Sequence, residues 1–184
     1  MIQQRRATVE DLYDVEGPAE LVGGRIVHDM VGERPAEVAS NIFISLHAQC
    51  KKTGRGKAFP DGLGYVARVD ATDRESFCPD VSCHTKPPAA NPMRFVIGAP
   101  DFAGEVRSEN DYGGTAVEAR LAQKREDYFA AGTQVVWDVD PENEEIAVYR
   151  ASDPTNPTIY RRGDVAEAEP AVPGWRMPVD EVFA

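Results

Sequence analysis

The sequence predicts a three-layered α/β or α+β fold in which a mixed central sheet is flanked by helices. Segments with helical spacing of apolar residues alternate with strand-like segments, in the order helix, hairpin, helix, strands, helix, strands. The chain has 184 residues, 42% of them hydrophobic, and no internal repeat, which is the size and composition of one compact domain. We therefore expect residues 1–184 to form a single domain.

The N-terminal segment predicts a short helix followed by a hairpin. Thr8-Val-Glu-Asp11 resembles a capping box, with Asp in place of the usual Glu, and Gly17-Pro18 ends the helix that it opens. Residues 19–22 and 25–30 then flank Gly23-Gly24, a two-residue connection that favours a β-hairpin. The first strand of this hairpin carries Glu20.

A long helix and two strands come next. A helix of about 17 residues is expected from Pro35 to the residues before Gly54, since its apolar side chains recur at helical spacing. The period then changes to two, which predicts strands over 64–69 and 77–83 separated by a polar turn at 70–74.

The next elements are a loop, a strand and a helix. Residues 87–100 are rich in proline and predict a loop, and residues 102–108 predict a strand. Thr115 and Glu118 have capping-box spacing, so we expect them to open a helix that runs to Ala131.

The C-terminal part predicts further strands and an ordered tail. Strands are expected over 134–138 and 145–150, with an edge strand at 158–161. Residues 165–184 form an acidic C-terminal appendage whose apolar side chains are expected to dock on the body.

Charge and cysteine content limit the function classes. The net charge of −11 and the pI near 4.7 repel polyanions, so any contact with nucleic acid must be local. The apolar runs are far shorter than the roughly 20 residues that span a bilayer, so no membrane partner is expected. Three cysteines without a Cys-x-x-Cys pair fit reduced thiols, and no secretory signal can be read at Met1, which together predict a cytoplasmic protein.

Two carboxylates stand where the pattern calls for buried side chains. Glu105 is in the middle of the strand at 102–108, on a sheet expected to be covered on both faces. Asp80 follows Pro79 inside an apolar segment, and it converges with Glu105 if the two strands are neighbours. Such hard oxygen donors suit Mg²⁺ or Mn²⁺.

Lys124 interrupts the apolar stripe of the helix at 115–131, a stripe formed with Val117, Leu121 and Tyr128. Held against the sheet, it would find counter-charges in Asp80 and Glu105. The alternative, which periodicity alone favours, is a lysine that extends along the stripe and reaches water. Glu20 has the same two interpretations, an acid of the site or a solvated side chain, and its place on a short hairpin favours solvation.

Several motifs in order resemble the Uma2 family of restriction-endonuclease-like proteins. The likeness extends to residues 8–12, 20–24 and 173–179, and so covers nearly the whole chain. The motifs are Pro79-Asp80, Pro100-Asp-Phe-Ala-Gly-Glu105-Val-Arg-Ser108, Lys124-x-x-x-Tyr128-x-x-x-Gly132 and Val136-Trp137-Asp-Val-Asp-Pro141.

This resemblance implies the PD-(D/E)xK nuclease fold, with a divalent metal, Mg²⁺ or Mn²⁺, bound by Asp80 and Glu105. It also implies that Lys124 fills the place of a lysine moved from the strand to the following helix, and that Glu20 completes the catalytic set. Arg107 stands where the parent motif has lysine. Because arginine stays protonated it cannot act as a base, but it suits contact with a phosphate.

The leading hypothesis is a metal-dependent endonuclease that hydrolyses phosphodiester bonds of nucleic acid, DNA in the first instance. The alternative is a catalytically inactive binding or regulatory module on the same scaffold, which the charge of −11 favours. A small-molecule hydrolase with the same metal is a third reading. The family scaffold also makes a homodimer an expectation.

Overall fold

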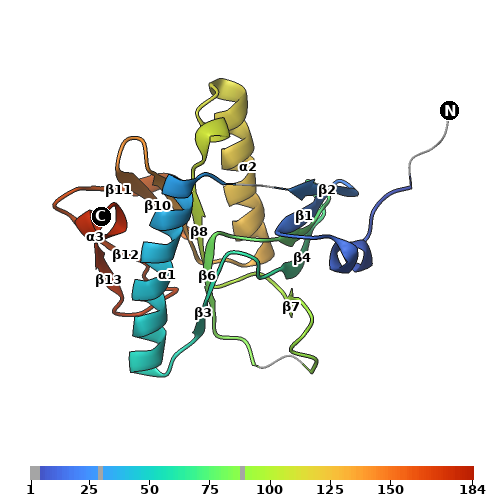
Figure 1. Cartoon of the computed structure of the whole chain (residues 1–184), viewed down its shortest axis with the longest axis horizontal. Coiled ribbons are helices and arrows are strands. Elements are labelled where there is room, and N and C mark those ends of the chain that lie inside the picture. Colours follow the sequence, from blue (N-terminus) through green and yellow to red (C-terminus); the bar gives the residue numbers. More distant parts are fainter. Residues whose placement is uncertain (1–4, 29–30, 88–89) are drawn as a thin grey trace.

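The computed structural model describes residues 5–28, 31–87 and 90–184 (Figure 1). Its centre is a six-stranded sheet in the order β11-β10-β9-β8-β6-β3. Only β8 and β9 run parallel among the paired strands of this sheet, so the sheet is mixed as predicted. The strands are β3 (Lys57–Pro60), β6 (Val81–His84), β8 (Phe102–Val106), β9 (Val135–Asp140), β10 (Glu145–Arg150) and β11 (Asp153–Arg161).

Helices cover both faces of this sheet. Helix α1 (Glu33–Thr53) buries Val38, Ile42 and Leu46 in a core with Phe102 and Trp137. Helix α2 (Thr115–Ala131) lies on the opposite face, where Tyr128 packs in a second core. This arrangement is the predicted three-layer architecture (Figure 1). The second core contains Tyr65, Ala67, Val69, Phe77, Ala99, Ala103, Tyr128 and Val136.

The prediction of one sheet and of one strand over 77–83 was wrong. A second, five-stranded sheet has the order β2-β1-β5-β4-β7, and the predicted strand is divided between β5 and β6, one in each sheet. Pro79 lies at the division, because proline has no N–H to donate to a ladder. The break places Asp80 between the sheets. The second sheet consists of β1 (Ala19–Val22), β2 (Arg25–His28), β4 (Tyr65–Val69), β5 (Arg74–Phe77) and β7 (Val96–Ile97).

One of the two predicted capping boxes is present at a helix N-terminus and the other is not. At η1 (Val9–Asp14), a 3₁₀ helix, the Asp11 carboxylate accepts the Thr8 N–H at 2.7 Å, as the capping-box pattern predicted. The predicted helix at 115–131 is confirmed, but its capping box is wrong: the N-cap is Gly114, with φ of 90°, and Thr115 is the first helical residue. Glu118 pairs with Arg107 instead.

Several boundaries differ from the predicted ones. Helix α1 has 21 residues and begins before Pro35, strand β3 was not predicted, and β11 begins at Asp153. The last two residues of the predicted strand at 25–30 lie outside the described residues, as do two residues of the predicted loop at 87–100.

The C-terminal tail is ordered and packs on the body, as expected. It forms β12 (Val165–Glu167), β13 (Arg176–Pro178) and α3 (Val179–Val182). Trp175 stacks on Trp137 with ring centroids 4.7 Å apart, so the tail closes the core beneath α1. No described helix is long and apolar enough to cross a membrane.

Candidate active site

The Lys124 ammonium joins two of the predicted carboxylates. Its Nζ lies 2.7 Å from Oε2 of Glu105 on β8 and 3.1 Å from Oε1 of Glu20 on β1. All three side chains are mostly buried, with 14–22% of each exposed. Lys124 therefore points into the molecule toward the sheet, and the alternative in which it reaches bulk water does not apply. Glu20 is likewise paired rather than solvated.

Asp80 lies beside this group at the start of β6. Val81 pairs with Gly104 in the antiparallel ladder between β6 and β8, which brings Asp80 next to Glu105. The Asp80 carboxylate accepts the backbone N–H of Val106 at 2.7 Å. Burial, together with the negative charge of Glu105, raises the pKa of Asp80 to about 8.

Glu105 is held from α2 by two donors one helical turn apart. The Tyr128 hydroxyl donates to Oε1 at 2.6 Å, and Lys124 donates to Oε2. Burial nevertheless raises the pKa of Glu105, and the charge of Glu20 acts in the same direction against the attraction of Lys124. Burial opposes the charge of Lys124, but Glu105 and Glu20 outweigh it and raise the pKa of Lys124. Lys124 is therefore a fixed cation.

Two buried residues that the sequence analysis missed complete the network. Arg74 on β5 donates to Glu20 at 2.5 Å and to Asp127 on α2 at 2.9 Å. Burial opposes ionisation of Glu20, but Lys124 and Arg74 outweigh it and lower its pKa. The local sequence pattern places Arg74 in the polar turn at 70–74. The sequence offers no signal for its role, because an arginine at the end of a turn is ordinarily solvated.

The buried charges do not balance. The buried cluster contains four carboxylates and only two cations; the carboxylates are Glu20, Asp80, Glu105 and Asp127, and the cations are Arg74 and Lys124. Within the described residues, Asp80 forms no ion pair with Lys or Arg. Burying an uncompensated carboxylate is costly, and the raised pKa of Asp80 expresses that cost.

This donor set fits a divalent cation. Asp80 and Glu105 are hard oxygen donors with an excess of negative charge, which Mg²⁺ or Mn²⁺ would offset. The part of the chain that the structure describes holds no group of three or more His, Cys, Asp or Glu side chains spaced for a metal. A cation here would therefore rest on two carboxylates, with backbone carbonyls and water as further ligands, as Mg²⁺ accepts.

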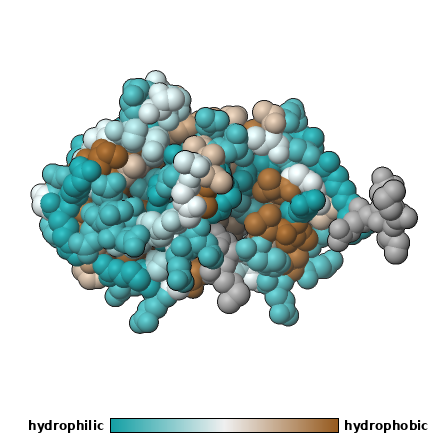
Figure 2. Space-filling model, turned by 90° about the horizontal axis from the view of Figure 1, so that it is seen from above, coloured by the Kyte–Doolittle hydropathy of each residue, from teal (hydrophilic) through white to brown (hydrophobic). Residues whose placement is uncertain are grey.

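Two pockets open onto this cluster. Asp80, Glu105, Arg120 and Lys124 line both of them. The larger, of about 210 Å³, lies beside the β1–β2 hairpin, whose Val22 and Val27 form part of its wall. Figure 2 shows the apolar surface of this hairpin from above. The entrance to the acidic cluster is therefore partly apolar.

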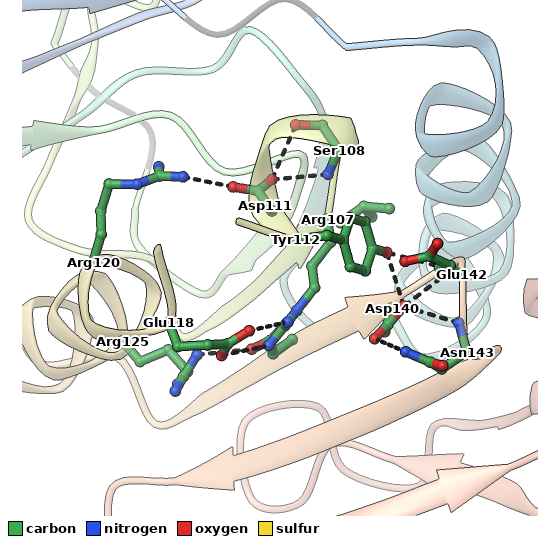
Figure 3. Close-up of polar contacts among 12 residues, drawn as sticks. Arg107, Ser108, Asp111, Tyr112, Glu118, Arg120, Arg125, Asp140, Glu142 and Asn143 are labelled. Carbon is green, nitrogen blue, oxygen red and sulfur yellow. Dashed lines mark hydrogen bonds and ion pairs between the residues drawn. The ribbon is translucent and has the colours of Figure 1, made fainter. Parts of the chain in front are cut away.

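Arg107, the predicted phosphate contact, is occupied by carboxylates (Figure 3). It donates to both oxygens of Asp138, at 2.8 and 3.0 Å, and to Glu118 at 2.6 Å. Arg125 donates to the same Asp138 at 2.7 Å. The guanidinium of Arg107 therefore contacts a phosphate only if Glu118 moves away.

Arg120 is the more accessible cation. Its side chain is 58% exposed and makes one bond, 2.7 Å long, to Oδ1 of Asp111 (Figure 3). The other oxygen of Asp111 accepts the N–H and hydroxyl of Ser108 at 2.8 and 3.0 Å, which fixes the carboxylate. Arg120 lies one helical turn before Lys124, so both cations face the same pockets.

Comparison with known proteins agrees with this description. Residues 8–180 match the family model Uma2, described as "Putative restriction endonuclease". The fold is similar to that of a crystal structure of "a putative nuclease belonging to DUF820" from Anabaena variabilis, with a TM-score of 0.72, 17% identity, and coverage of 96% of this chain and 97% of that one. This likeness confirms the predicted fold. No curated protein matches the sequence.

Proposed function

Since the chain belongs to the Uma2 family of restriction-endonuclease-like proteins, we propose that it is a divalent-metal-dependent nuclease that hydrolyses phosphodiester bonds in the pocket around Asp80 and Glu105. The observation that supports this most is the convergence of acids from three separate segments around one lysine, with negative charge in excess. DNA is the substrate that we propose.

Asp80 and Glu105 would hold the metal. Mg²⁺ or Mn²⁺ at such a site activates water and stabilises the charge that develops on the phosphate. Because Asp80 carries a proton over much of the neutral range, binding of a cation there releases that proton. Cation affinity therefore rises with pH up to about 8.

The chain's own cations bind and orient the substrate. Lys124 cannot serve as a base, because its neighbours keep it protonated. It stabilises negative charge on the phosphate and holds Glu105 and Glu20 in place. Arg120 offers its free guanidinium donors to a phosphate oxygen at the rim.

The test is cleavage of labelled DNA and RNA by purified protein with Mg²⁺ or Mn²⁺. Asp80→Asn keeps the shape of the side chain and the acceptor for Val106 but removes the carboxylate that would hold the metal, so it should abolish cleavage. Asp70→Asn is the matched control, because Asp70 is 88% exposed in the β4–β5 turn. Cleavage that survives in Asp80→Asn would place the activity elsewhere or in a contaminant.

A second candidate is a binding module that no longer cleaves. The occupied guanidinium of Arg107 and the net charge of −11 favour it. Calorimetric titration with Mn²⁺ separates the two: heat of binding that disappears in Asp80→Asn supports the nuclease, and its absence in the unaltered protein supports the binding module.

A further inference from the structure

The basic residues of this acidic protein are unevenly distributed along the chain. Residues 38–60 contain Lys51, Lys52, Arg55 and Lys57 but no Asp or Glu, although the whole chain has a net charge of −11. This segment comprises most of α1, the turn at Gly54 and strand β3. Positive charge is therefore gathered in one place.

The same cations differ from the others in their partners. Within the described residues, most Lys and Arg side chains lie within ion-pair distance of a carboxylate, as Arg94, Arg161 and Arg176 do. The side chains of Lys51, Lys52, Arg55 and Lys57 form no ion pair there, and all are exposed. We call these four residues the basic end.

The basic end shares no residue with the two pockets of the candidate active site. It comprises the last turn of α1 and the residues that follow, at the bottom of the view in Figure 1, whereas α2 begins at the top. Lys57 pairs with His84, the last residue of β6. Burial lowers the pKa of His84, and the nearby charges of Lys86 and Lys57 lower it further against the attraction of Asp101.

A pocket of about 360 Å³ opens at the basic end. His47, Lys51, Lys57 and Phe59 contribute to its wall. The Phe59 ring is half-buried and stacks on His84, with centroids 5.3 Å apart and an interplanar angle of 6°. Exposed cations beside a partly exposed aromatic ring are typical of surfaces that bind nucleic-acid strands, through phosphates and stacked bases.

Helix stability explains only part of this cluster. Lys51 and Lys52 are in the last turn of α1, where cations favourably meet the negative end of the helix dipole. Arg55 and Lys57 lie beyond the helix, and the dipole does not account for them. These two cations are exposed and form no ion pair within the described residues, so they repel their neighbours and no ion pair offsets that repulsion.

We propose that the basic end binds the phosphate backbone of nucleic acid at a place separate from the catalytic pocket. The proposal rests on the proposed nuclease function, which it deepens by naming a surface that retains the substrate. Strand β6 connects the two places, since Asp80 precedes it and His84 ends it, a separation of roughly 13 Å along the strand.

The experiment measures binding without cleavage. The full chain carrying Asp80→Asn is titrated against fluorescent single-stranded and duplex DNA by anisotropy, over a series of salt concentrations. One variant adds Lys52→Gln, Arg55→Gln and Lys57→Gln. Its control adds Arg94→Gln, Arg161→Gln and Arg176→Gln, which removes the same charge from exposed cations elsewhere.

We expect the basic-end variant to bind at least about tenfold more weakly at physiological salt, with a salt slope lower by roughly 2 for single strands and 3 for duplex. The control should match the parent. Equal losses in both variants, or an unchanged slope in the basic-end variant, would overturn the proposal.

These outcomes are separate from a failure of the nuclease function. If the salt slope of DNA binding is the same with and without the basic-end substitutions, while the protein with Asp80 intact still cleaves DNA, only the proposed second binding surface is refuted. Binding that depends on the basic end, in a protein that cleaves nothing with Mg²⁺ or Mn²⁺, refutes only the proposed catalysis.

Discussion

Asp80→Asn should stabilise the protein while it removes the proposed activity. The folded protein raises the pKa of Asp80 from the ordinary value of 3.8 to about 8. At pH 7 the solution is about three pH units above the ordinary pKa of the group, and each unit corresponds to 1.36 kcal/mol. The substitution therefore raises the free energy of unfolding by at most about 4 kcal/mol. Because Asp80 is only partly buried, solvent screening reduces this gain to about 2–4 kcal/mol.

The sign of the pH dependence follows from the same shift. A group whose pKa is raised on folding binds more protons in the folded state, so its contribution to stability is present below pH 4 and lost as pH rises toward 8. Asparagine carries no titrating proton. The difference in unfolding free energy between Asp80→Asn and the parent should therefore be near zero at pH 4, grow through neutrality and level off above pH 8.

Urea denaturation and thermal melts, without divalent metal, measure this difference at pH 4, 7 and 8.5. For a chain of this length, we expect the melting temperature to rise by roughly 5–10 °C at pH 7. Asp70→Asn removes an equal charge from an exposed position and should change little. A variant no more stable than the parent at pH 7, with a parallel pH profile, would refute the placement of an uncompensated acid at this site.

Substitutions at three further residues test the rest of the network. Lys124→Met leaves Glu105 and Glu20 without their shared cation, so we expect the free energy of unfolding to fall by about 3–5 kcal/mol at pH 8. The loss should be smaller at pH 5, because carboxylates gain protons there. Equal losses at both pH values in urea denaturation would contradict this. Arg74→Met should destabilise by a similar amount, and Arg74→Lys should restore only part of it, because an ammonium cannot span both carboxylates that the guanidinium binds. Arg120→Gln should weaken DNA binding about tenfold while it changes stability by less than about 1 kcal/mol, since its ion pair is exposed; a large drop in melting temperature would argue for a structural role instead.

Much of the fold was predictable because its signals are local. Periodicity identified the helix that carries Lys124, and Glu105 lies within a predicted strand, where its carboxylate contacts Lys124. The division of the predicted strand at Pro79 was not identified, although Pro79 itself was the signal. A proline inside an apolar run should have suggested two strands.

The partners of the site residues were less predictable, because they depend on how two sheets meet. Arg74 lies in a segment whose local pattern predicts a turn, and it becomes buried only when β5 pairs with β1. Arg107 looked free in sequence because its neighbours in space, Asp138 and Glu118, belong to later elements. Single-sequence patterns identify charged residues at buried positions but not which opposite charges satisfy them.

The placement of Asp80 relates folding to the proposed chemistry. A fold selected for stability alone would pair or neutralise every buried carboxylate, as it does for Asp127 through Arg74. Here Lys124 serves both Glu20 and Glu105, and Asp80 keeps only a backbone N–H donor. In the proposed nuclease, a divalent cation bound between Asp80 and Glu105 would offset the cost of burying Asp80, so the imbalance that weakens the unliganded fold would contribute to metal affinity.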